Sequence, residues 1–327
     1  MFNSLIKKEL DLLESEIALI IPKEPKEVYG MLVPYIKLGG KRIRPALSIL
    51  TSLAFNGHIK DVLRPAAIIE LFHNFTLIHD DIEDNSLLRR GEPTLHISHG
   101  IPIALNSGDA LYTLIWIEII NLDLPVTKLI ELQKRYVVTF KRLVEGQGIE
   151  LSWHRQRIFS LGENEYLSMI SGKTSALMGL SCELGAFIAG KDKKTQEELR
   201  NFGECIGMAF QIQDDVLNLT GNLDEYKKEI GGDITEGKRT LLVIHALSNA
   251  DESDRSFILS CLNSNTSDQD KIKKCIQLLS KYGSIDYARK KAELLVNEAK
   301  KHLFCLPPSK FRDELFKISD FVVSRKS

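Results

Sequence analysis

The sequence predicts an all-α fold, and three observations support that fold class. Glycine and proline are sparse, at 21 and 10 of the 327 residues, and 43% of the residues are hydrophobic, which is ordinary for a globular protein. Long stretches lack the alternation of polar and apolar residues that is typical of β-strands. Breaks that contain glycine or proline leave segments of helical length between them. We therefore expect a single large helical domain that spans residues 1–327.

The expected helices differ in how much of their surface is apolar. Residues 1–20 place acidic side chains within an apolar pattern, which predicts an amphipathic helix and not a signal peptide. Residues 110–122, ALYTLIWIEIINL, are hydrophobic almost all round, so we expect this helix to be buried at the centre of the protein. No segment is expected to be long and apolar enough to span a bilayer. Residues 249–269 are polar and rich in serine, which predicts a surface connection near a peripheral helical region.

Composition argues against several classes of protein. The formal net charge of −1 gives no strong overall field, so nothing indicates binding to nucleic acid. The five cysteines are odd in number and form no CxxC pair, which argues against a disulfide framework or a zinc knuckle and fits a reducing cytoplasm. No Ser/His/Asp or Cys/His pattern and no GxSxG turn is discernible, so covalent catalysis is not expected.

Two aspartate-rich clusters, each preceded by an apolar run, carry the clearest chemical signal. The first aspartate cluster is Asp80-Asp81-Ile82-Glu83-Asp84, and the second is Asp214-Asp215-Val216-Leu217-Asn218. On a helix, positions i, i+1 and i+4 lie within about a third of the circumference, so Asp80, Asp81 and Asp84 are expected to share one side of their helix. Asp214 and Asp215 repeat this arrangement, and Asn218 supplies a neutral oxygen at the third position. Oxygen ligands without histidine or cysteine suit Mg²⁺. One such cluster alone would more often be a solvated helix face, whereas two favour a metal site.

Basic residues are placed as a diphosphate site would require. Lys41 and Arg44 follow Gly39-Gly40 and are expected one helical turn apart, so that both can bind one anion. Arg89 and Arg90 come just after the first aspartate cluster, and we assign Arg42 to a surface salt bridge. Gly172-Lys173-Thr174 lacks the GxxxxGK spacing of a phosphate loop, which excludes a nucleoside triphosphatase.

The histidines are weaker candidates. His73 lies two helical turns before Asp80, on nearly the same face, and is a candidate donor to a second anion. His79 adjoins the first aspartate cluster, and a functional role and a buried ring satisfied by its neighbours both stay open. His96 and His99 are assigned no metal site, because no third ligand is near them in the sequence.

Taken in order, these motifs resemble the trans-isoprenyl diphosphate synthases, or polyprenyl synthetases. The resemblance runs from Gly39-Gly40-Lys41-Arg42 through both aspartate clusters, Arg89-Arg90-Gly91-Glu92-Pro93-Thr94, Gly172-Lys173-Thr174 and Phe210-Gln211-Ile212-Gln213, to Gly232-Asp233-Ile234-Thr235-Glu236-Gly237-Lys238. It implies the isoprenoid synthase helical bundle with a large central cavity, in a protein that is usually a homodimer.

The resemblance also implies an activity and a set of roles. A prenyltransferase of this family joins isopentenyl diphosphate head to tail (1′-4) to an allylic diphosphate, which is dimethylallyl, geranyl or farnesyl diphosphate, and releases diphosphate. By similarity, Mg²⁺ is held by Asp80, Asp84 and Asp214, with support from Asp81, Asp215 and Asp233. The allylic diphosphate is bound by Arg89, Lys173, Lys228 and Lys238, with Thr174 and Gln211 at the reacting end. Isopentenyl diphosphate is bound by Lys41, Arg44, His73 and Arg90.

The chain departs from the family pattern in two places that bear on these roles. Asn218 stands where many relatives have aspartate, a variation associated with geranylgeranyl-forming members. Tyr226-Lys227-Lys228 replaces a usual Gly-Lys, so the assignment of Lys228 over Lys227 rests on spacing from Asp214.

Bulky side chains before the first aspartate cluster are expected to set the floor of the product cavity. Phe75 and Phe72 lie five and eight residues before Asp80, and core packing is the alternative for both and the preferred role for Phe72. One aromatic at Phe75 beside the small Thr76 resembles geranylgeranyl diphosphate synthases, as do the stretches DDIEDNSLLRRG and VEGQGIEL. We therefore expect a C20 product, with farnesyl or longer-chain products as alternatives.

Two rival functions remain to be weighed. A terpene cyclase shares the expected fold and the first cluster, but should replace the second with an Asn/Ser/Glu pattern and needs no site for isopentenyl diphosphate. A non-catalytic regulatory subunit of a prenyl synthase is expected to have lost acidic or basic site residues, and this sequence keeps both sets.

Overall fold

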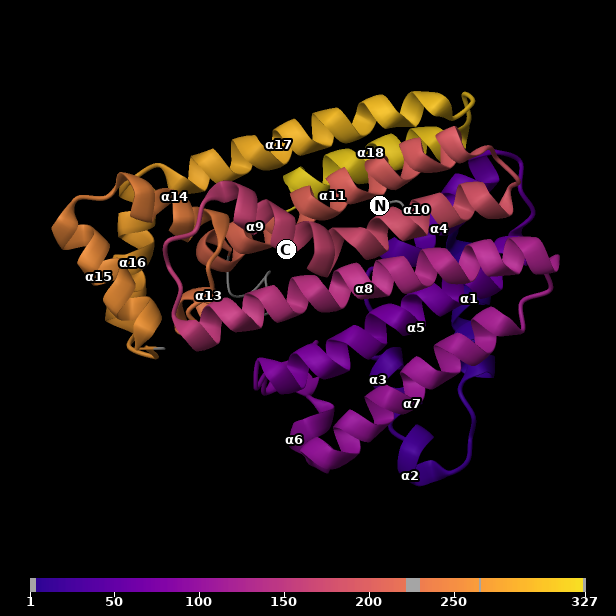
Figure 1. Cartoon of the computed structure of the whole chain (residues 1–327), viewed down its shortest axis with the longest axis horizontal. Helices are drawn as coiled ribbons and strands as arrows, with labels where there is room; N and C mark the ends of the chain where they lie inside the picture. The colour runs from indigo at the N-terminus through magenta and orange to yellow at the C-terminus, as the bar shows by residue number, and fades with distance from the viewer. Residues whose placement is uncertain (1–3, 222–229, 265, 326–327) are drawn as a thin grey trace. The chain divides into compact units, whose positions relative to one another are not determined.

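The computed structural model describes residues 4–221, 230–264 and 266–325. Within this part of the chain the structure is helical except for one two-stranded hairpin, which confirms the all-α prediction (Figure 1). The chain divides into two compact units. The first unit consists of Met1–Val138, Leu180–Arg200 and Leu303–Leu315, and the second of Thr139–Gly179, Asn201–His302 and Phe316–Ser327. The single-domain assignment stays a prediction.

The first unit contains the N-terminal helices and the hairpin. Its elements are α1 (Lys7–Ile20), α2 (Lys26–Tyr29), α3 (Leu32–Lys37), α4 (Ile43–Ala54), α5 (Ile59–Glu83), β1 (Leu88–Arg89), β2 (Glu92–Pro93), α6 (Leu95–His99), α7 (Ile101–Ile120) and the short η3 (Leu303–Cys305). Four helices contribute residues to both units, namely α8 (Val126–Gln156), α10 (Ala176–Ile188), α11 (Lys193–Thr220) and α18 (Lys310–Ser324).

Helix α5 is the core of the first unit, because α1, α4 and α7 all pack against it. Its middle turns bury Ile68, Ile69 and Leu71 completely, and each buried side chain of this size contributes about 1.5–3 kcal/mol to folding. The amphipathic helix predicted for residues 1–20 is confirmed as α1, which buries Leu10 and Leu13 at helical spacing. This packing fixes the C-terminal end of α5, where the first aspartate cluster lies.

Helix α7 corrects the prediction of a fully buried central helix. One side packs on α5 and α6, while Ile101, Ile103, Leu105, Ile117 and Ile120 are exposed. Among the described residues, α7 is also the one helix long and apolar enough to cross a membrane, and 39% of its most apolar stretch is buried. A single helix of this kind is weak evidence for a membrane span, but it corrects the expectation that no segment reaches this length and hydropathy.

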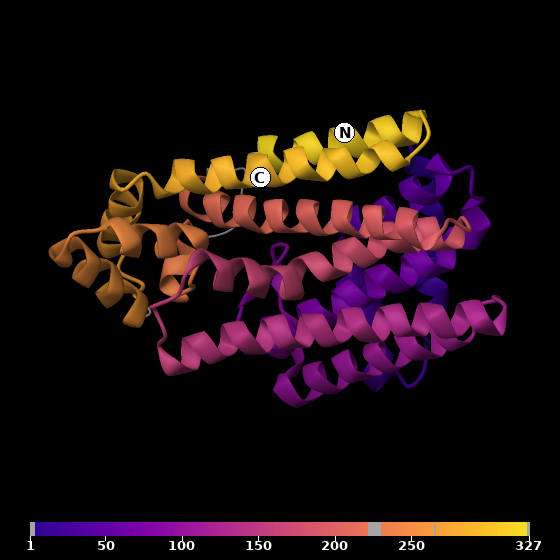
Figure 2. The same cartoon turned by 45° about the horizontal axis from the view of Figure 1, so that its top comes forward.

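The second unit holds the remaining helices. They are α9 (Glu163–Ile170), the π-helical turn η2 (Ser171–Ser175), α13 (Gly232–Thr235), α14 (Leu241–Asn249), α15 (Glu252–Asn263), α16 (Gln269–Lys281) and α17 (Ser284–His302). Helix α14 packs against α9, α15, α16 and α17. The C-terminal part of α18 runs beside α17, where Lys300 and Asp320 form an ion pair (Figures 1 and 2).

The surface connection predicted for residues 249–269 is instead largely helical. Helix α15 occupies Glu252–Asn263 and buries Ile258, Cys261 and Leu262. Asp251 begins the helix by accepting a hydrogen bond from the backbone N–H of Asp254, a standard N-terminal cap. The serine-rich composition hid an apolar stripe at helical spacing.

Candidate functional site

The first aspartate cluster separates into one buried and two partly exposed carboxylates. Asp81 is 1% exposed, and its Oδ2 accepts a hydrogen bond of 3.0 Å from the Tyr35 hydroxyl. Its Oδ1 accepts from Arg89 Nε at 2.9 Å. Asp80 and Asp84 are half-buried at the C-terminal end of α5, where Asp84 is the capping residue. The three carboxylates therefore do not present equivalent oxygens to one side, because Asp81 is committed to internal donors.

Tyr35 is a neutral donor to this carboxylate. Burial, followed by the charge of Asp81, raises the pKa of Tyr35 well above its ordinary value. The phenol therefore keeps its proton, and Asp81 is held by one neutral and one cationic partner. Sequence analysis did not single out Tyr35, because it lies 46 residues from Asp81 and only tertiary packing brings them together.

The hairpin and the Gly39-Gly40 loop bring basic residues to His73. Gly40 has a φ of +146°, which favours glycine, and a Cβ there would lie 2.9 Å from Arg90 Nη2, so this loop passes close to Arg90. Burial, and then the charges of Arg44 and Arg90, hold the pKa of His73 well below its usual range. The ring is therefore neutral, and it shares its surroundings with two of the three other residues predicted to bind isopentenyl diphosphate.

Lys41 does not have the predicted helical relation to Arg44. Helix α4 begins at Ile43 and is capped by Arg42 in a left-handed conformation, so Lys41 precedes the helix and is exposed. The salt-bridge assignment of Arg42 is confirmed, but Arg42 and its partner Glu70 are buried and not at the surface, whereas its second partner, Glu14, is 45% exposed. Arg42 Nη1 lies 2.5 Å from Glu70 Oε1, and its Nε lies 2.6 Å from Glu14 Oε1.

An aromatic cluster lies on the turns that precede the first aspartate cluster. Phe75 is 8% exposed, and its ring centroid lies 5.1 Å from that of Tyr112 on α7. Phe72 is 1% exposed, which fits the core role preferred for it. Tyr112 was not singled out from the sequence, because its register against Phe75 depends on how α5 and α7 pack.

His79 is satisfied by its neighbours, one of the two roles left open for it. Its Nδ1 lies 3.2 Å from the carbonyl oxygen of Phe75, and its Nε2 lies 3.4 Å from Asp109 Oδ1. A Cβ at Gly108 would lie 2.5 Å from the ring, so the absence of a side chain there makes room for the imidazole.

The second aspartate cluster, on α11, also contains one buried carboxylate. Asp215 is 5% exposed, and it accepts hydrogen bonds from the Tyr166 hydroxyl at 2.6 Å and from Gln211 Nε2 at 2.9 Å. Thr174 donates its hydroxyl proton to Gln211 Oε1 at 2.9 Å. The predicted residues Thr174, Gln211 and Asp215 therefore form one hydrogen-bonded network, to which the structure adds Tyr166.

The donors to Asp215 are neutral, which affects its charge. Burial, followed by the nearby Asp233, raises the pKa of Asp215 to about 8, although the bonds from Tyr166 and Gln211 oppose the shift. The neighbouring Asp214 is more exposed, at 34% of its side chain. As in the first cluster, a buried aspartate stands beside an accessible one.

Asn218 does not offer the free oxygen that the sequence suggested. The side chain is 7% exposed, and its Oδ1 accepts a hydrogen bond of 3.1 Å from the backbone N–H of Asp233. The backbone carbonyl of Asn218 also accepts from Gly231 at 2.8 Å. Asn218 therefore holds the start of α13 in place, which positions Asp233.

Two of the three predicted diphosphate-binding lysines of the second unit pair with acidic side chains. Lys173 donates to Glu150, and Lys238 pairs with Glu236 at 2.5 Å and with Asp233 at 3.6 Å. Although burial opposes the shift, Lys173 and then Lys238 lower the pKa of Glu150 below its ordinary value. Glu150 lies within the stretch VEGQGIEL, where no local motif marks it as a site residue. The third lysine, Lys228, and its alternative Lys227 lie outside the described residues.

The donor set fits a divalent cation that is shared with a ligand. Within the described ranges, no three His, Cys, Asp or Glu side chains are grouped closely enough to hold a metal by themselves. Each cluster instead combines accessible carboxylate oxygens with a second carboxylate fixed by hydrogen bonds. Mg²⁺ keeps several waters and is commonly bound by one or two carboxylates together with substrate phosphates, so these residues suit it.

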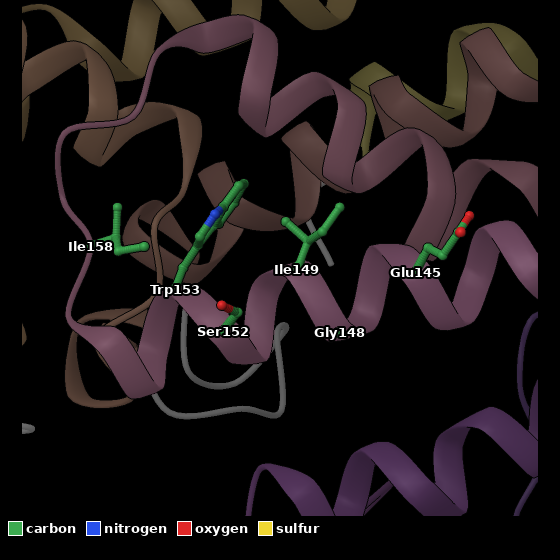
Figure 3. Close-up of a pocket in the computed structure, with 6 residues that line it drawn as sticks. All are labelled: Glu145, Gly148, Ile149, Ser152, Trp153 and Ile158. Carbon is green, nitrogen blue, oxygen red and sulfur yellow. The ribbon is translucent and has the colours of Figure 1, made fainter.

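A hollow in the second unit does not coincide with these residues. It has a volume of about 500 Å³, is widely open to solvent, and lies along α8 and the loop after it (Figure 3). Its lining residues are Glu145, Gly148, Ile149, Ser152, Trp153 and Ile158. None of the predicted site residues lines it, so we assign it no role in catalysis.

Comparison with known proteins gives a consistent result. Residues 25–279 match the family model for polyprenyl synthetase. A geranylgeranyl pyrophosphate synthase from Geoglobus acetivorans is 34% identical over 99% of both chains. A geranylfarnesyl diphosphate synthase from Natronomonas pharaonis is 33% identical over 99% of this chain and 97% of its own. The crystal structure of geranylgeranyl pyrophosphate synthetase from Pyrococcus horikoshii superimposes with a TM-score of 0.92 at 36% identity, covering 99% of this chain and 98% of that one.

Proposed function

The chain belongs to the polyprenyl synthetase family and is a prenyltransferase, and we propose that it makes geranylgeranyl diphosphate (C20) from isopentenyl diphosphate and an allylic diphosphate in a magnesium-dependent 1′-4 condensation. One observation carries the proposal: both aspartate clusters pair a buried carboxylate, fixed by a tyrosine and a second donor, with accessible carboxylates beside it. Closely spaced carboxylates held in this way lower the stability of the fold unless a cation compensates their charge.

The first cluster and the second would each contribute to binding the allylic diphosphate. Asp80, Asp84 and Asp214 would hold Mg²⁺, while Asp81 and Asp215 act as their fixed neighbours. When bound, Mg²⁺ neutralises the charge that develops on the leaving diphosphate. Arg89, Lys173, Lys228 and Lys238 would bind the remaining diphosphate oxygens by charge-assisted hydrogen bonds.

Isopentenyl diphosphate would bind through Lys41, Arg44, Arg90 and His73. Three of these lie together in the first unit, as the effect of Arg44 and Arg90 on His73 indicates. A neutral imidazole donates from only one nitrogen, so His73 would orient the anion while the guanidinium groups supply the charge. With His73 orienting the diphosphate and the arginines binding its charge, the alkene of isopentenyl diphosphate would be held at a fixed position relative to the allylic carbon.

The reaction is an ionisation followed by attack. The allylic C–O bond breaks with both electrons leaving on diphosphate, the alkene of isopentenyl diphosphate attacks the allylic cation, and a proton is lost to the released diphosphate. The Thr174 hydroxyl donates to Gln211 and keeps its oxygen lone pairs. Oriented oxygens of this kind would stabilise the cation electrostatically.

We propose that Phe75 limits the product to twenty carbons. Of the two phenylalanines before the first cluster it is the nearer in sequence, and its ring packs on that of Tyr112 across α5 and α7. The geranylgeranyl names of two similar proteins support C20, while the geranylfarnesyl name of a third makes a longer product the alternative.

The exposed apolar side of α7 supports a homodimer. Five large apolar side chains of α7 are between 43% and 55% exposed, namely Ile101, Ile103, Leu105, Ile117 and Ile120. A patch of this composition favours burial against a second copy of the chain. We also propose a cytoplasmic location, which the five free cysteines support.

Product analysis tests the proposed activity. Purified protein is incubated with Mg²⁺, isopentenyl diphosphate and each of dimethylallyl, geranyl and farnesyl diphosphate in turn, and the dephosphorylated products are separated by chromatography. We expect geranylgeraniol as the longest main product, and no product when EDTA removes the metal. A main product of C15 or of C25 and longer would contradict the C20 assignment, and undiminished turnover in EDTA would contradict the metal requirement.

A further inference from the structure

The C-terminal end of the described chain contacts the second aspartate cluster through Arg325. This residue follows α18, and its side chain is only 4% exposed. Its Nη2 lies 2.5 Å from Asp214 Oδ1. An arginine buried to this degree requires specific partners, because an unpaired buried charge is strongly unfavourable.

Most of the contacts of Arg325 do not depend on Asp214. Its Nη2 also donates to the carbonyl oxygen of Phe210 at 2.8 Å, and its Nε donates to the carbonyl oxygen of Val322 at 3.3 Å. Its guanidinium carbon lies 3.9 Å from the centroid of the Phe210 ring. Gln213 Nε2 donates to the Arg325 carbonyl at 3.4 Å. The guanidinium group is therefore held to Phe210 on α11 and to Val322 on α18 by contacts that do not involve Asp214.

We infer that Arg325 is a positioning residue for Asp214, holding one carboxylate oxygen so that the other is directed to the metal. The inference rests on the proposed function, in which Asp214 binds Mg²⁺. A carboxylate has two oxygens, and the pair with Arg325 engages Oδ1, which leaves Oδ2 for the metal. The C-terminal end of the chain thereby becomes part of the diphosphate site.

The alternative role, a counter-ion that the metal displaces, fits the contacts less well. Displacement would require the guanidinium group to leave the Phe210 carbonyl, the Phe210 ring and the Val322 carbonyl. It would then have to find new partners inside the protein or become exposed to solvent. Phe210 lies one helical turn before Asp214 on α11, so one guanidinium can bind both without any movement of the helix. Partners of this kind around metal-binding carboxylates fix the orientation of the ligand.

Binding of Mn²⁺ in the presence of inorganic diphosphate tests the inference without measuring turnover. Free Mn²⁺ is followed by electron paramagnetic resonance during titration of the wild-type chain and of Arg325→Gln, Arg325→Lys and Lys300→Gln. The last variant is the control, because it removes the Lys300–Asp320 ion pair on the same C-terminal helix without touching the aspartate cluster. Thermal melting of each variant reports whether α18 stays folded.

We expect Arg325→Gln to weaken Mn²⁺ binding by about 10-fold or more, which is the effect usual for loss of a partner that orients a metal ligand. Arg325→Lys should restore part of the affinity, and Lys300→Gln should bind as the wild type does. If Arg325→Gln does not fold, Arg325→Lys decides the matter, since a lysine cannot reproduce the planar fork and should still bind more weakly than the wild type.

Unchanged or tighter Mn²⁺ binding by folded Arg325→Gln would overturn the inference, as would an equal loss in Lys300→Gln. In either case, normal binding by the wild-type chain would leave the proposed function intact. Failure of the wild-type chain itself to bind Mn²⁺ with diphosphate would instead overturn the metal assignment on which the inference rests.

Discussion

The two aspartate clusters are alike in plan but differ in where the positive charge lies. In the first, the guanidinium of Arg89 binds the buried Asp81 directly, together with Tyr35. In the second, the buried Asp215 accepts hydrogen bonds from the neutral donors Tyr166 and Gln211, without a cationic donor among the described residues, and the guanidinium of Arg325 binds its neighbour Asp214. Burial and then the charge of Asp233 raise the pKa of Asp215, and the hydrogen bonds from Tyr166 and Gln211 oppose that shift, so the second cluster depends more on its neutral hydrogen bonds.

The largest expected effect comes from removing an accessible carboxylate. Asp80→Ala should lower kcat by about 100-fold or more, because it removes a proposed metal ligand from the partly exposed end of α5. The measurement is steady-state turnover with Mg²⁺, alongside thermal melting. Glu83→Ala is the matched control, since Glu83 is an exposed carboxylate on the same helical turn outside the proposed ligand set. Normal turnover of Asp80→Ala would contradict the assignment of this cluster to metal binding.

The difference in charge between the two clusters predicts that Tyr166→Phe and Tyr35→Phe change the Mg²⁺ requirement of the enzyme unequally. Tyr166→Phe should raise the Mg²⁺ concentration needed for half-maximal turnover by about 10-fold, because Asp215 then loses one of the two donors that the described part of the chain provides. Tyr35→Phe should have a smaller effect, because Arg89 still binds Asp81. The two variants serve as controls for each other in metal titrations of activity. Equal effects, or a larger effect in Tyr35→Phe, would show that the position of the cation does not distinguish the clusters.

The aromatic cluster lies on the turns that precede the first aspartate cluster. A substitution there should change the length of the product and not the Mg²⁺ requirement. Phe75→Ala should lengthen the main product by at least one isoprene unit, because removing the ring opens space beside Tyr112. Phe72→Ala is the control: it should cost about 3–5 kcal/mol of stability, as expected for a buried ring, with no change in product length. The products are separated by chromatography. Identical product lengths from the wild type and Phe75→Ala would show that Phe75 only packs in the core and does not limit product length.

The smallest expected effect on the chemistry comes from the exposed side of α7. Leu105→Lys should shift the protein from dimer to monomer, because it places a charge in the apolar patch. Size-exclusion chromatography with light scattering measures the mass in solution. Leu294→Lys, at another exposed leucine in α17, is the control and should leave the mass unchanged. A wild-type chain that is already monomeric would contradict the dimer proposal.

Periodicity and motif spacing predicted the features that depend on local sequence. The helix at residues 1–20 followed from apolar residues at helical spacing, and both aspartate clusters are on or at the end of helices as expected. Local sequence patterns gave wrong predictions where burial or hydrogen bonding of a side chain depends on a neighbour that is brought close by the tertiary fold. The exposed side of α7 could not be told from a buried one by its composition, and Asn218 was read as a free oxygen because its bond to Asp233 depends on the turn that follows.

The residues that orient the aspartates were the least predictable part of the site. Tyr35, Tyr166 and Arg325 reach their carboxylates from 46, 49 and 111 residues away along the sequence, so no spacing rule connects them. Tyrosine and arginine are also common packing residues with no motif of their own here. Only the three-dimensional contacts distinguish them from other buried polar side chains.

The most direct test of the central claim is anomalous diffraction from crystals soaked with Mn²⁺ and a non-hydrolysable allylic thiolodiphosphate. We predict manganese peaks within bonding distance of Asp80, Asp84 and Asp214, with the diphosphate group bound to the same ions. A diphosphate found at another place in the protein, with no manganese at either aspartate cluster, would contradict the account.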